Sequence, residues 1–300
     1  RQAAPPEDAR PPGALAAAQA LAARLAARRG GGMPALAVVH AFSTHNLLLR
    51  YWLAAGGIDP EQDVRLVVVP PARVVDALRE RRIDGFCAGA PWGLVAARDG
   101  LGATVATSHG IWRNGPEKIF AVAAAWAERH PEGLQAALRA LLHAGRCCNA
   151  PASAVEIAAI LAQGAYLDMP AATILASLPG GAEGASGAAS VFFDNAATFP
   201  WRSQALWFLG EMARWGFIGA DLDRPAIAET IYRPDLYAVA ATALGLSVPL
   251  SDRKTEGTHD RSWMLEALPS PIAMGPDLFC DGAVFDPREP VPSGGKRQRP

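Results

Sequence analysis

Lysine is nearly absent from this chain of 300 residues. Lys and Arg together number 28, against 29 Asp and Glu, yet only Lys118, Lys254 and Lys296 are lysines. The formal net charge is −1 and no basic run stands out, which argues against nucleic acid as a direct partner. In a chain that uses arginine almost everywhere else, each lysine raises the question of a specific role.

Long apolar runs are also missing. The longest covers residues 119–127, whereas about 20 apolar residues are needed to span a membrane. Residues 1–12 are polar and rich in proline, so no secretory leader precedes the first strand. We therefore expect no transmembrane segment and a cytoplasmic location. A periplasmic or membrane-associated location is the alternative if a leader lies upstream of this sequence.

Cysteine is scarce, and its spacing excludes the common cysteine sites. Cys87, Cys147, Cys148 and Cys280 form no C-x-x-C pair and no zinc-ligand pattern. The neighbours Cys147 and Cys148 fall in a predicted helix, where they cannot easily bond to each other. Reduced, structural cysteines are the simplest interpretation, and they favour the cytosol.

Catalytic patterns are missing as well. Ser43 lies near two histidines, but the chain has no G-x-S-x-G turn and no aspartate placed to orient a histidine. Cys87 ends a strand in apolar surroundings, which do not favour a thiolate. The acidic segment around Glu256 and His259 matches no metal-ligand spacing, and we interpret it as a solvated loop. We predict that the chain is not an enzyme and that it holds no cofactor and no metal.

Alternating strand and helix patterns are what the first part of the chain does contain. This alternation predicts βαβ units and a mainly parallel sheet, hence an α/β fold. After residue 118 the pattern becomes mostly helical, with a glycine-rich loop at 180–187 and mostly coil after residue 245. The expected strands lie at 35–39, 64–69, 83–87, 103–107 and 119–123, and the expected helices at 14–29, 44–55, 74–81, 133–147, 152–163, 170–178, 203–215 and 234–244.

Three residues in loops are candidates to bind a small anion. His45 lies in the first turn of a helix, where backbone N–H groups and the helix dipole favour negative charge. Gly89 follows the third strand and lets a ligand approach the backbone, and Lys118 supplies a full positive charge. The loops after the first and third strands leave the carboxyl ends of parallel strands, where α/β sheets bind ligands. Taken singly, each residue is more often a helix cap, a plain turn or a solvated cation.

Several motifs, in order along the chain, carry a family resemblance. They are HAFSTHN at 40–46, RYWLA at 50–54, DGFCAGAPW at 84–92, GPEK at 115–118, FPWRS at 199–203 and YRPDLY at 232–237, with weaker support at 256–257 and 279–287. From about residue 14 to 287 the chain resembles the nitrate-binding family. That family joins the substrate-binding proteins of nitrate and bicarbonate ABC transporters with the soluble nitrate/nitrite sensors of assimilation operons.

The resemblance implies a fold of the type-two periplasmic binding protein, in which two α/β lobes close on a ligand. It also implies that His45, Gly89 and Lys118 contact the bound anion, with Lys118 neutralising its charge. Two positions depart from the family pattern: Ala90 stands where the family usually has Glu, and Ala41 where it usually has Pro. The loss of that Glu removes a counter-charge near Lys118.

The front of the chain departs most from the family, because nothing in it matches the βαβ stretch that opens the first lobe. We expect a linker and helix at 1–29, one complete α/β lobe at 30–118, a helical return to an incomplete first lobe at 119–245, and an extended tail at 246–300. On this interpretation the C-terminal helices lack their own sheet and expose apolar surface, and anion affinity is severely reduced.

The expected function is binding of nitrate or nitrite. The chain would serve either as the substrate-binding component of an ABC importer, with a permease as partner, or as a soluble sensor with an antiterminator response regulator as partner. Two alternatives stay open. One is an enzyme related to thiamine-pyrimidine synthesis on the same fold, and the other is a remnant that binds nothing.

Overall fold

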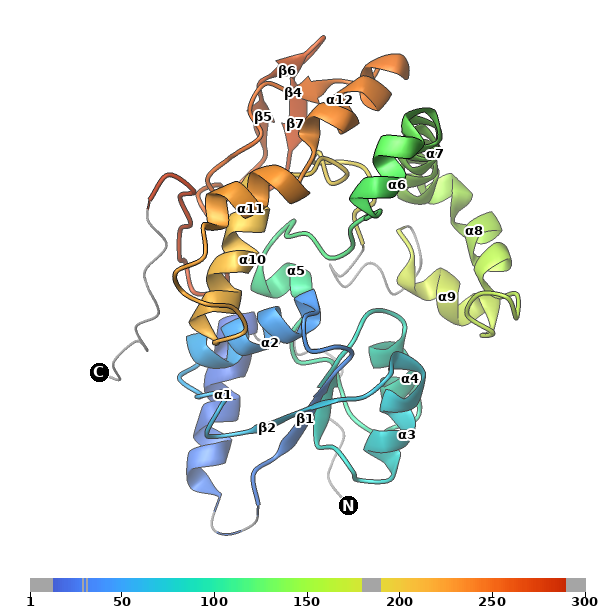
Figure 1. The fold of residues 1–300 in the computed structure, drawn as a ribbon. Coiled ribbons are helices and arrows are strands. Elements are labelled where there is room, and N and C mark those ends of the chain that lie inside the picture. The colour runs from blue at the N-terminus through green and yellow to red at the C-terminus, as the bar shows by residue number, and fades with distance from the viewer. Residues whose placement is uncertain (1–12, 29, 31, 180–189, 290–300) are drawn as a thin grey trace. The chain divides into compact units, whose positions relative to one another are not determined.

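The computed structural model describes residues 13–28, 30, 32–179 and 190–289, and Figure 1 shows their fold. The chain divides into two compact units, Arg1–Ile111 (unit 1) and Trp112–Pro300 (unit 2). The glycine-rich loop expected at 180–187 lies outside the described residues. No helix in the described ranges is long and apolar enough to cross a membrane.

Unit 1 is built on a parallel sheet of three strands in the order β2-β1-β3. The strands are β1 (Ala35–Val38), β2 (Arg65–Val68) and β3 (Gly85–Cys87). The central strand β1 pairs in parallel with β2 through Ala35↔Arg65 and with β3 through Val38↔Cys87. The predicted α/β class with a parallel sheet is therefore confirmed.

Helices cover both faces of this sheet, as parallel strands require. Figure 1 shows α1 and α2 on one side of it and α3 and α4 on the other. On the α3 side, Ala77 is fully buried and packs with Ala35 and Ala37 of β1. The helices of unit 1 are α1 (Ala14–Ala27), α2 (Thr44–Ala55), the short 3₁₀ helix η1 (Pro71–Arg73), α3 (Val74–Arg79), α4 (Trp92–Arg98) and α5 (Ser108–Ile111).

The strand predicted at 103–107 is wrong, because the structure has irregular chain there. This segment runs beside α4 instead of pairing with the sheet: the hydroxyl oxygen of Thr104 lies 3.1 Å from where a Cβ on Gly93 would stand. Strand propensity in a short segment is realised only where an edge is offered to it. The strand predicted at 119–123 is wrong for the same reason, since those residues form exposed, unpaired chain.

Unit 2 is mainly helical in its described part. Its helices are α6 (Ala124–Arg129), α7 (Pro131–Asn149), η2 (Pro151–Ser153), α8 (Ala154–Leu161), α9 (Ala171–Ser177), α10 (Arg202–Arg214), α11 (Arg224–Ile231) and α12 (Pro234–Ala243). Its strands form two antiparallel pairs, β4 (Val248–Pro249) with β6 (Ala267–Leu268), and β5 (Trp263–Leu265) with β7 (Ile272–Met274). The segment expected as a tail thus carries four short strands.

The core of unit 2 is aromatic. Phe199 lies edge-on to Trp201 at 4.7 Å between ring centroids and to Tyr237 at 5.2 Å. Leu142 of α7 and Met274 of β7 join the same buried cluster. Edge-to-face aromatic pairs add to the free energy of burial, so this cluster ties α7, α12 and the C-terminal strands together.

Large apolar side chains nevertheless face solvent in unit 2. Ile119, Val155, Tyr166, Ile231 and Val239 are each more than half exposed. Of these, Val155, Ile231 and Val239 lie on helices. That a missing sheet leaves the C-terminal helices exposed stays a prediction.

Helix α2 is the centre of unit 1. Its residues from Asn46 to Leu53 are all buried, so it makes apolar contacts on nearly every side. The indole N–H of Trp52 donates to the carbonyl oxygen of Ala14 on α1 at 2.6 Å. At the C-terminal end of α2, a Cβ on Gly56 would stand 2.5 Å from the Cβ of Ala18. The close approach of α1 and α2 therefore requires glycine at this position.

The substitution Gly56→Ala tests this contact. The added methyl group forces α1 away from α2, and we expect the free energy of unfolding to fall by about 1–3 kcal/mol. Gly102→Ala is the matched control, because a Cβ there meets nothing within 4 Å. Urea unfolding followed by far-UV circular dichroism measures both variants. Equal free energies of unfolding for the two variants would show that α1 moves to accommodate the methyl group without loss of stability.

Candidate anion-binding site

The turn between β1 and α2 is closed by hydrogen bonds from its own residues. The backbone N–H and the hydroxyl of Ser43 both donate to the carbonyl oxygen of His40, at 3.2 and 2.8 Å. Ser43 also caps α2, because its side chain accepts from the backbone N–H of Asn46 at 3.2 Å. Ser is a favoured residue at this position, so the local sequence fixes where α2 begins.

The two histidines of the turn have different roles. Nδ1 of His40 accepts the backbone N–H of Phe42 at 3.1 Å, so its ring is turned back onto the turn. His45 is the second residue of α2 and is half-buried. A side chain in the first helical turn lies beside the positive end of the helix dipole. His45 therefore lies at the N-terminal end of α2, whereas the His40 ring is engaged by the turn itself.

Two buried polar residues of α2, Asn46 and Arg50, stabilise this turn through side-chain hydrogen bonds. The side-chain amide of Asn46 donates to the carbonyl oxygen of Ala41 at 2.6 Å and accepts from Nε of Arg50 at 3.2 Å. Arg50 is 8% exposed and pairs with Glu61. Residues four apart lie on one face of a helix, so Asn46 and Arg50 act together. Asn46 lies in the motif at 40–46 and Arg50 in the motif at 50–54. The one signal of their joint role in the sequence is that two polar residues stand four positions apart on an otherwise apolar helix.

Gly89 lies at the same edge of the sheet as this turn. Strand β3 ends at Cys87, which is in register with Val38 at the end of β1, and the two strands run parallel. The chain therefore leaves both strands on one side. Gly89 then accepts a hydrogen bond from the backbone N–H of Trp92 at 3.4 Å, closing the turn into α4. The structure thus brings the His45 turn and the Gly89 turn to one edge of unit 1.

Lys118 belongs to unit 2. It lies in the irregular segment 113–123, its side chain is 78% exposed, and it pairs with the neighbouring Glu117. The three predicted site residues are therefore divided between the units, two on unit 1 and one on unit 2. The structure divides the chain after residue 111. The expected α/β lobe ends at residue 118, so the two boundaries differ by the segment 112–118.

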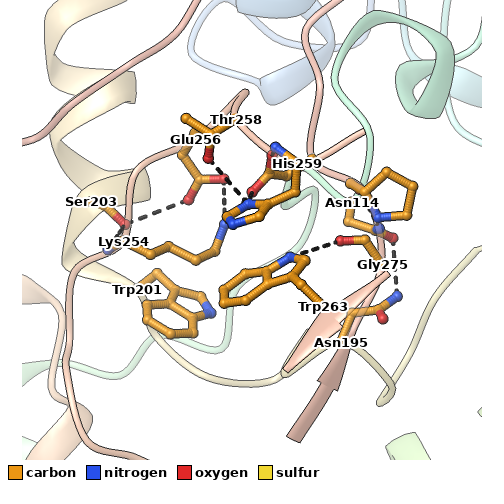
Figure 2. Close-up of polar contacts among 12 residues, drawn as sticks. Asn114, Asn195, Trp201, Ser203, Lys254, Glu256, Thr258, His259, Trp263 and Gly275 are labelled. Atoms are coloured by element: carbon orange, nitrogen blue, oxygen red, sulfur yellow. Dashed lines mark hydrogen bonds and ion pairs between the residues drawn. The ribbon is translucent and has the colours of Figure 1, made fainter. Parts of the chain in front are cut away.

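Unit 2 also holds a buried cluster of charges, which Figure 2 shows. Glu256 is fully buried and pairs with Lys254. Asp277, 3% exposed, accepts from the backbone N–H of His259 at 2.8 Å and lies 2.8 Å from Nδ1 of that ring. The interpretation of this segment as a solvated loop is therefore wrong for Glu256. Among the described residues, no group of three or more His, Cys, Asp or Glu is arranged to hold a metal.

Removing the charged groups of this cluster from water is unfavourable, and the ion pairs between them offset that desolvation cost. Burial raises the pKa of Glu256, while the neighbouring ammonium of Lys254 opposes that rise and Asp277 adds to it. Lys254 stands 4.0 Å from Asp277 as well, so one cation serves two buried carboxyl groups. Removing it would leave both without their shared counter-charge.

Lys254→Met tests this dependence. Without the cation, the pKa of Glu256 in the folded protein rises further. A carboxyl group with a raised pKa favours folding at low pH and opposes it as the pH rises. We expect the free energy of unfolding at pH 8 to fall by about 3–5 kcal/mol, and to fall by less near pH 4. Arg261→Met is the control, because its side chain is 86% exposed. A loss that does not change with pH would contradict the role of charge.

A parallel α/β unit with a capped helix start and a glycine turn at one sheet edge, followed by a second compact unit, matches the class of proteins with the periplasmic binding protein fold. The crystal structure of the periplasmic nitrate-binding protein NrtA from Synechocystis has this fold, with a TM-score of 0.74 and 29% identity over 90% of this chain and 67% of that chain. The chain belongs to the NMT1-like family, whose model matches residues 8–162.

Two curated relatives extend the comparison. The nitrate/nitrite binding protein NrtA of Synechococcus elongatus is 34% identical over 272 residues, which is 88% of this chain and 57% of that protein. The bicarbonate transport ATP-binding protein CmpC of the same species is 38% identical over 256 residues, 85% of this chain and 36% of CmpC. The chain therefore spans about half or less of the length of these relatives. The NrtA relative is named as a binding protein, which agrees with the prediction that the chain is not an enzyme.

The prediction of a cytoplasmic location is wrong. The NrtA protein of Synechocystis, which shares the fold over 90% of this chain, is periplasmic. The prediction relied on the polar first residues and on cysteines that form no pairs. Cys87, Cys147, Cys148 and Cys280, all within the described residues, form no disulfide, but a protein without disulfides is chemically compatible with an oxidising compartment, so cysteine usage does not decide the location.

Proposed function

We propose that this protein binds a small planar anion, nitrate or nitrite, as the substrate-binding component of an ABC importer. The observation that carries the proposal is the meeting of the His45 turn and the Gly89 turn at one edge of a parallel sheet, in a chain whose solved relative binds nitrate. Ligands of open α/β sheets bind at this edge.

The chemistry of the three residues suits such an anion. His45 donates hydrogen bonds from its ring, and the turn at Gly89 lets the backbone approach the ligand without a side chain between them. Lys118 of unit 2 enters the proposal through the family resemblance alone, as the compensating charge, because hydrogen bonds that involve charged groups are stronger than neutral ones. The set contains donors and one cation, which matches an anion that can only accept hydrogen bonds.

The proposed partners are the membrane and ATP-binding components of the importer. CmpC, a bicarbonate transport ATP-binding protein, contains a region 38% identical to this chain, which supports a role beside an ATP-driven transporter. A soluble sensor acting with an antiterminator response regulator is the competing assignment, and neither relative named above is described as a sensor. A neighbouring gene for a permease supports the importer, and one for an RNA-binding regulator supports the sensor.

Titration calorimetry with nitrate tests the site. We expect His45→Ala and Lys118→Ala each to weaken binding by about tenfold or more, because each removes a hydrogen bond to a charged ligand. His40→Ala and Arg261→Ala are the matched controls, since the first removes the histidine held in the turn and the second removes an exposed cation from unit 2. Both controls should bind as the wild type does.

Titrations with nitrite, bicarbonate and chloride rank the ligands. Tighter binding of bicarbonate than of nitrate would reassign the anion, and equal affinity of His45→Ala and the wild type would move the site elsewhere.

A further inference from the structure

A histidine and an aspartate hold the C-terminal strip of unit 2, residues 275–279, against the loop that precedes β5. Asp277 accepts from the backbone N–H of His259 and lies beside Nδ1 of its ring, each at 2.8 Å. In return, the backbone N–H of Asp277 donates to the carbonyl oxygen of His259 at 3.0 Å. One pair of residues thus makes three contacts between the strip and the loop.

The ring of His259 is also held from its other side, as Figure 2 shows. It stacks on Trp263 of β5, with 4.0 Å between ring centroids and 9° between ring planes. The indole N–H of Trp263 donates to the carbonyl oxygen of Gly275, the first residue of the strip, at 3.2 Å. The side chain of His259 is nevertheless 32% exposed, so the imidazole is fixed in place and still exchanges protons with solvent.

The strip in turn holds the residues with which unit 2 begins. Trp112 is 1% exposed, and its ring stacks on Phe279 at 4.9 Å between centroids. The same two residues form an antiparallel β-bridge, and the backbone N–H of Arg113 donates to the carbonyl oxygen of Leu278 at 3.0 Å. Any loosening of the strip therefore also loosens residues 112 and 113.

The charges around this ring are balanced by one added proton. Glu256 and Asp277 are both buried, and as carboxylates they carry two negative charges. Lys254 pairs with Glu256 and stands 4.0 Å from Asp277, so it supplies one positive charge. A protonated His259, 2.8 Å from Asp277, supplies the second. Buried charges are costly without a counter-charge, so the cluster favours taking up this proton.

Two groups of the cluster compete for the proton. Burial raises the pKa of Glu256, and the ammonium paired with it opposes that rise. Asp277, in contrast, has the imidazole as its nearer cationic partner, and imidazole is the side chain that changes charge between about pH 5 and 8. Asp260 and Arg261 are 70% and 86% exposed and pair with each other, so solvent screens their charges. The geometry therefore favours His259 as the site of the proton.

We propose that His259 is a pH-sensitive switch for the C-terminal strip. The protonated ring holds Asp277 through an ion pair, and the neutral ring holds it through a hydrogen bond from Nδ1 alone. Hydrogen bonds between charged groups are the stronger ones. The added hold is therefore present at low pH and is lost as the imidazole releases its proton. This inference does not depend on the proposed anion site, because every contact in it lies within unit 2.

His259→Asn tests the switch, because asparagine keeps an N–H donor near the position of Nδ1 and cannot change charge. The measurement is amide hydrogen exchange at about pH 5.5 and about pH 8, expressed as protection relative to the unstructured chain. In the wild type we expect protection at 277–279 to be about tenfold lower at the higher pH, with a smaller fall at 112 and 113. In His259→Asn that difference should disappear.

His143→Asn is the matched control. It makes the same exchange on α7, where the exposed ring faces Sγ of Cys147 at 3.7 Å instead of a carboxylate. It should keep the pH dependence of the wild type. Three results overturn the inference: equal protection at both pH values in the wild type, a fall spread evenly over unit 2, or the full fall retained in His259→Asn. The last of these would assign the proton to Glu256.

A titration of the wild type alone decides the question if His259→Asn does not fold. The ring signals of His259 are identified in NMR spectra by their contact with the ring of Trp263. We expect these signals and the amide signal of Asp277 to change over the same pH range with one midpoint, because one proton controls both. Different midpoints for the ring and the amide overturn the switch.

Discussion

Parallel pairing of β1 with β2 and β3 is the constraint on which unit 1 depends. Parallel strands cannot be joined by tight turns, so helices must return the chain across the faces of the sheet. The same pairing sends the chain out of β1 and β3 at one edge. The His45 turn and the Gly89 turn meet there because of the sheet, and their own sequences decide only how each turn is closed.

Unit 2 depends on a different constraint, because it buries charged side chains that must be paired. Glu256 is fully buried, and its pairing with Lys254 and the contacts of Asp277 with His259 stabilise an irregular C-terminal strip. That strip is also the acceptor for Asn114. Buried polar networks are costly when incomplete and rigid when complete, and this one lies beside the segment that leads to Lys118.

Local patterns predicted elements well where one face of the element is buried along its whole length. The strand predicted at 35–39 and the helix predicted at 44–55 agree with the structure nearly to their ends, since apolar spacing marks them. The strands expected at 103–107 and 119–123 have comparable propensity but no partner to pair with. A strand forms only where a second strand is available to pair with it, so propensity alone could not decide these two segments.

The sequence by itself determined the α/β class and the helix over 44–55, and it proposed three residues for an anion. It did so because hydrophobic period and motif spacing are local properties. Only the tertiary structure decided that Lys118 belongs to unit 2, that Glu256 is buried, and that Asn114 is tied to the C-terminal strip. The physical reason is distance along the chain: Asn114 and Pro276 are separated by 162 residues, and a contact between them exists only after the chain has folded.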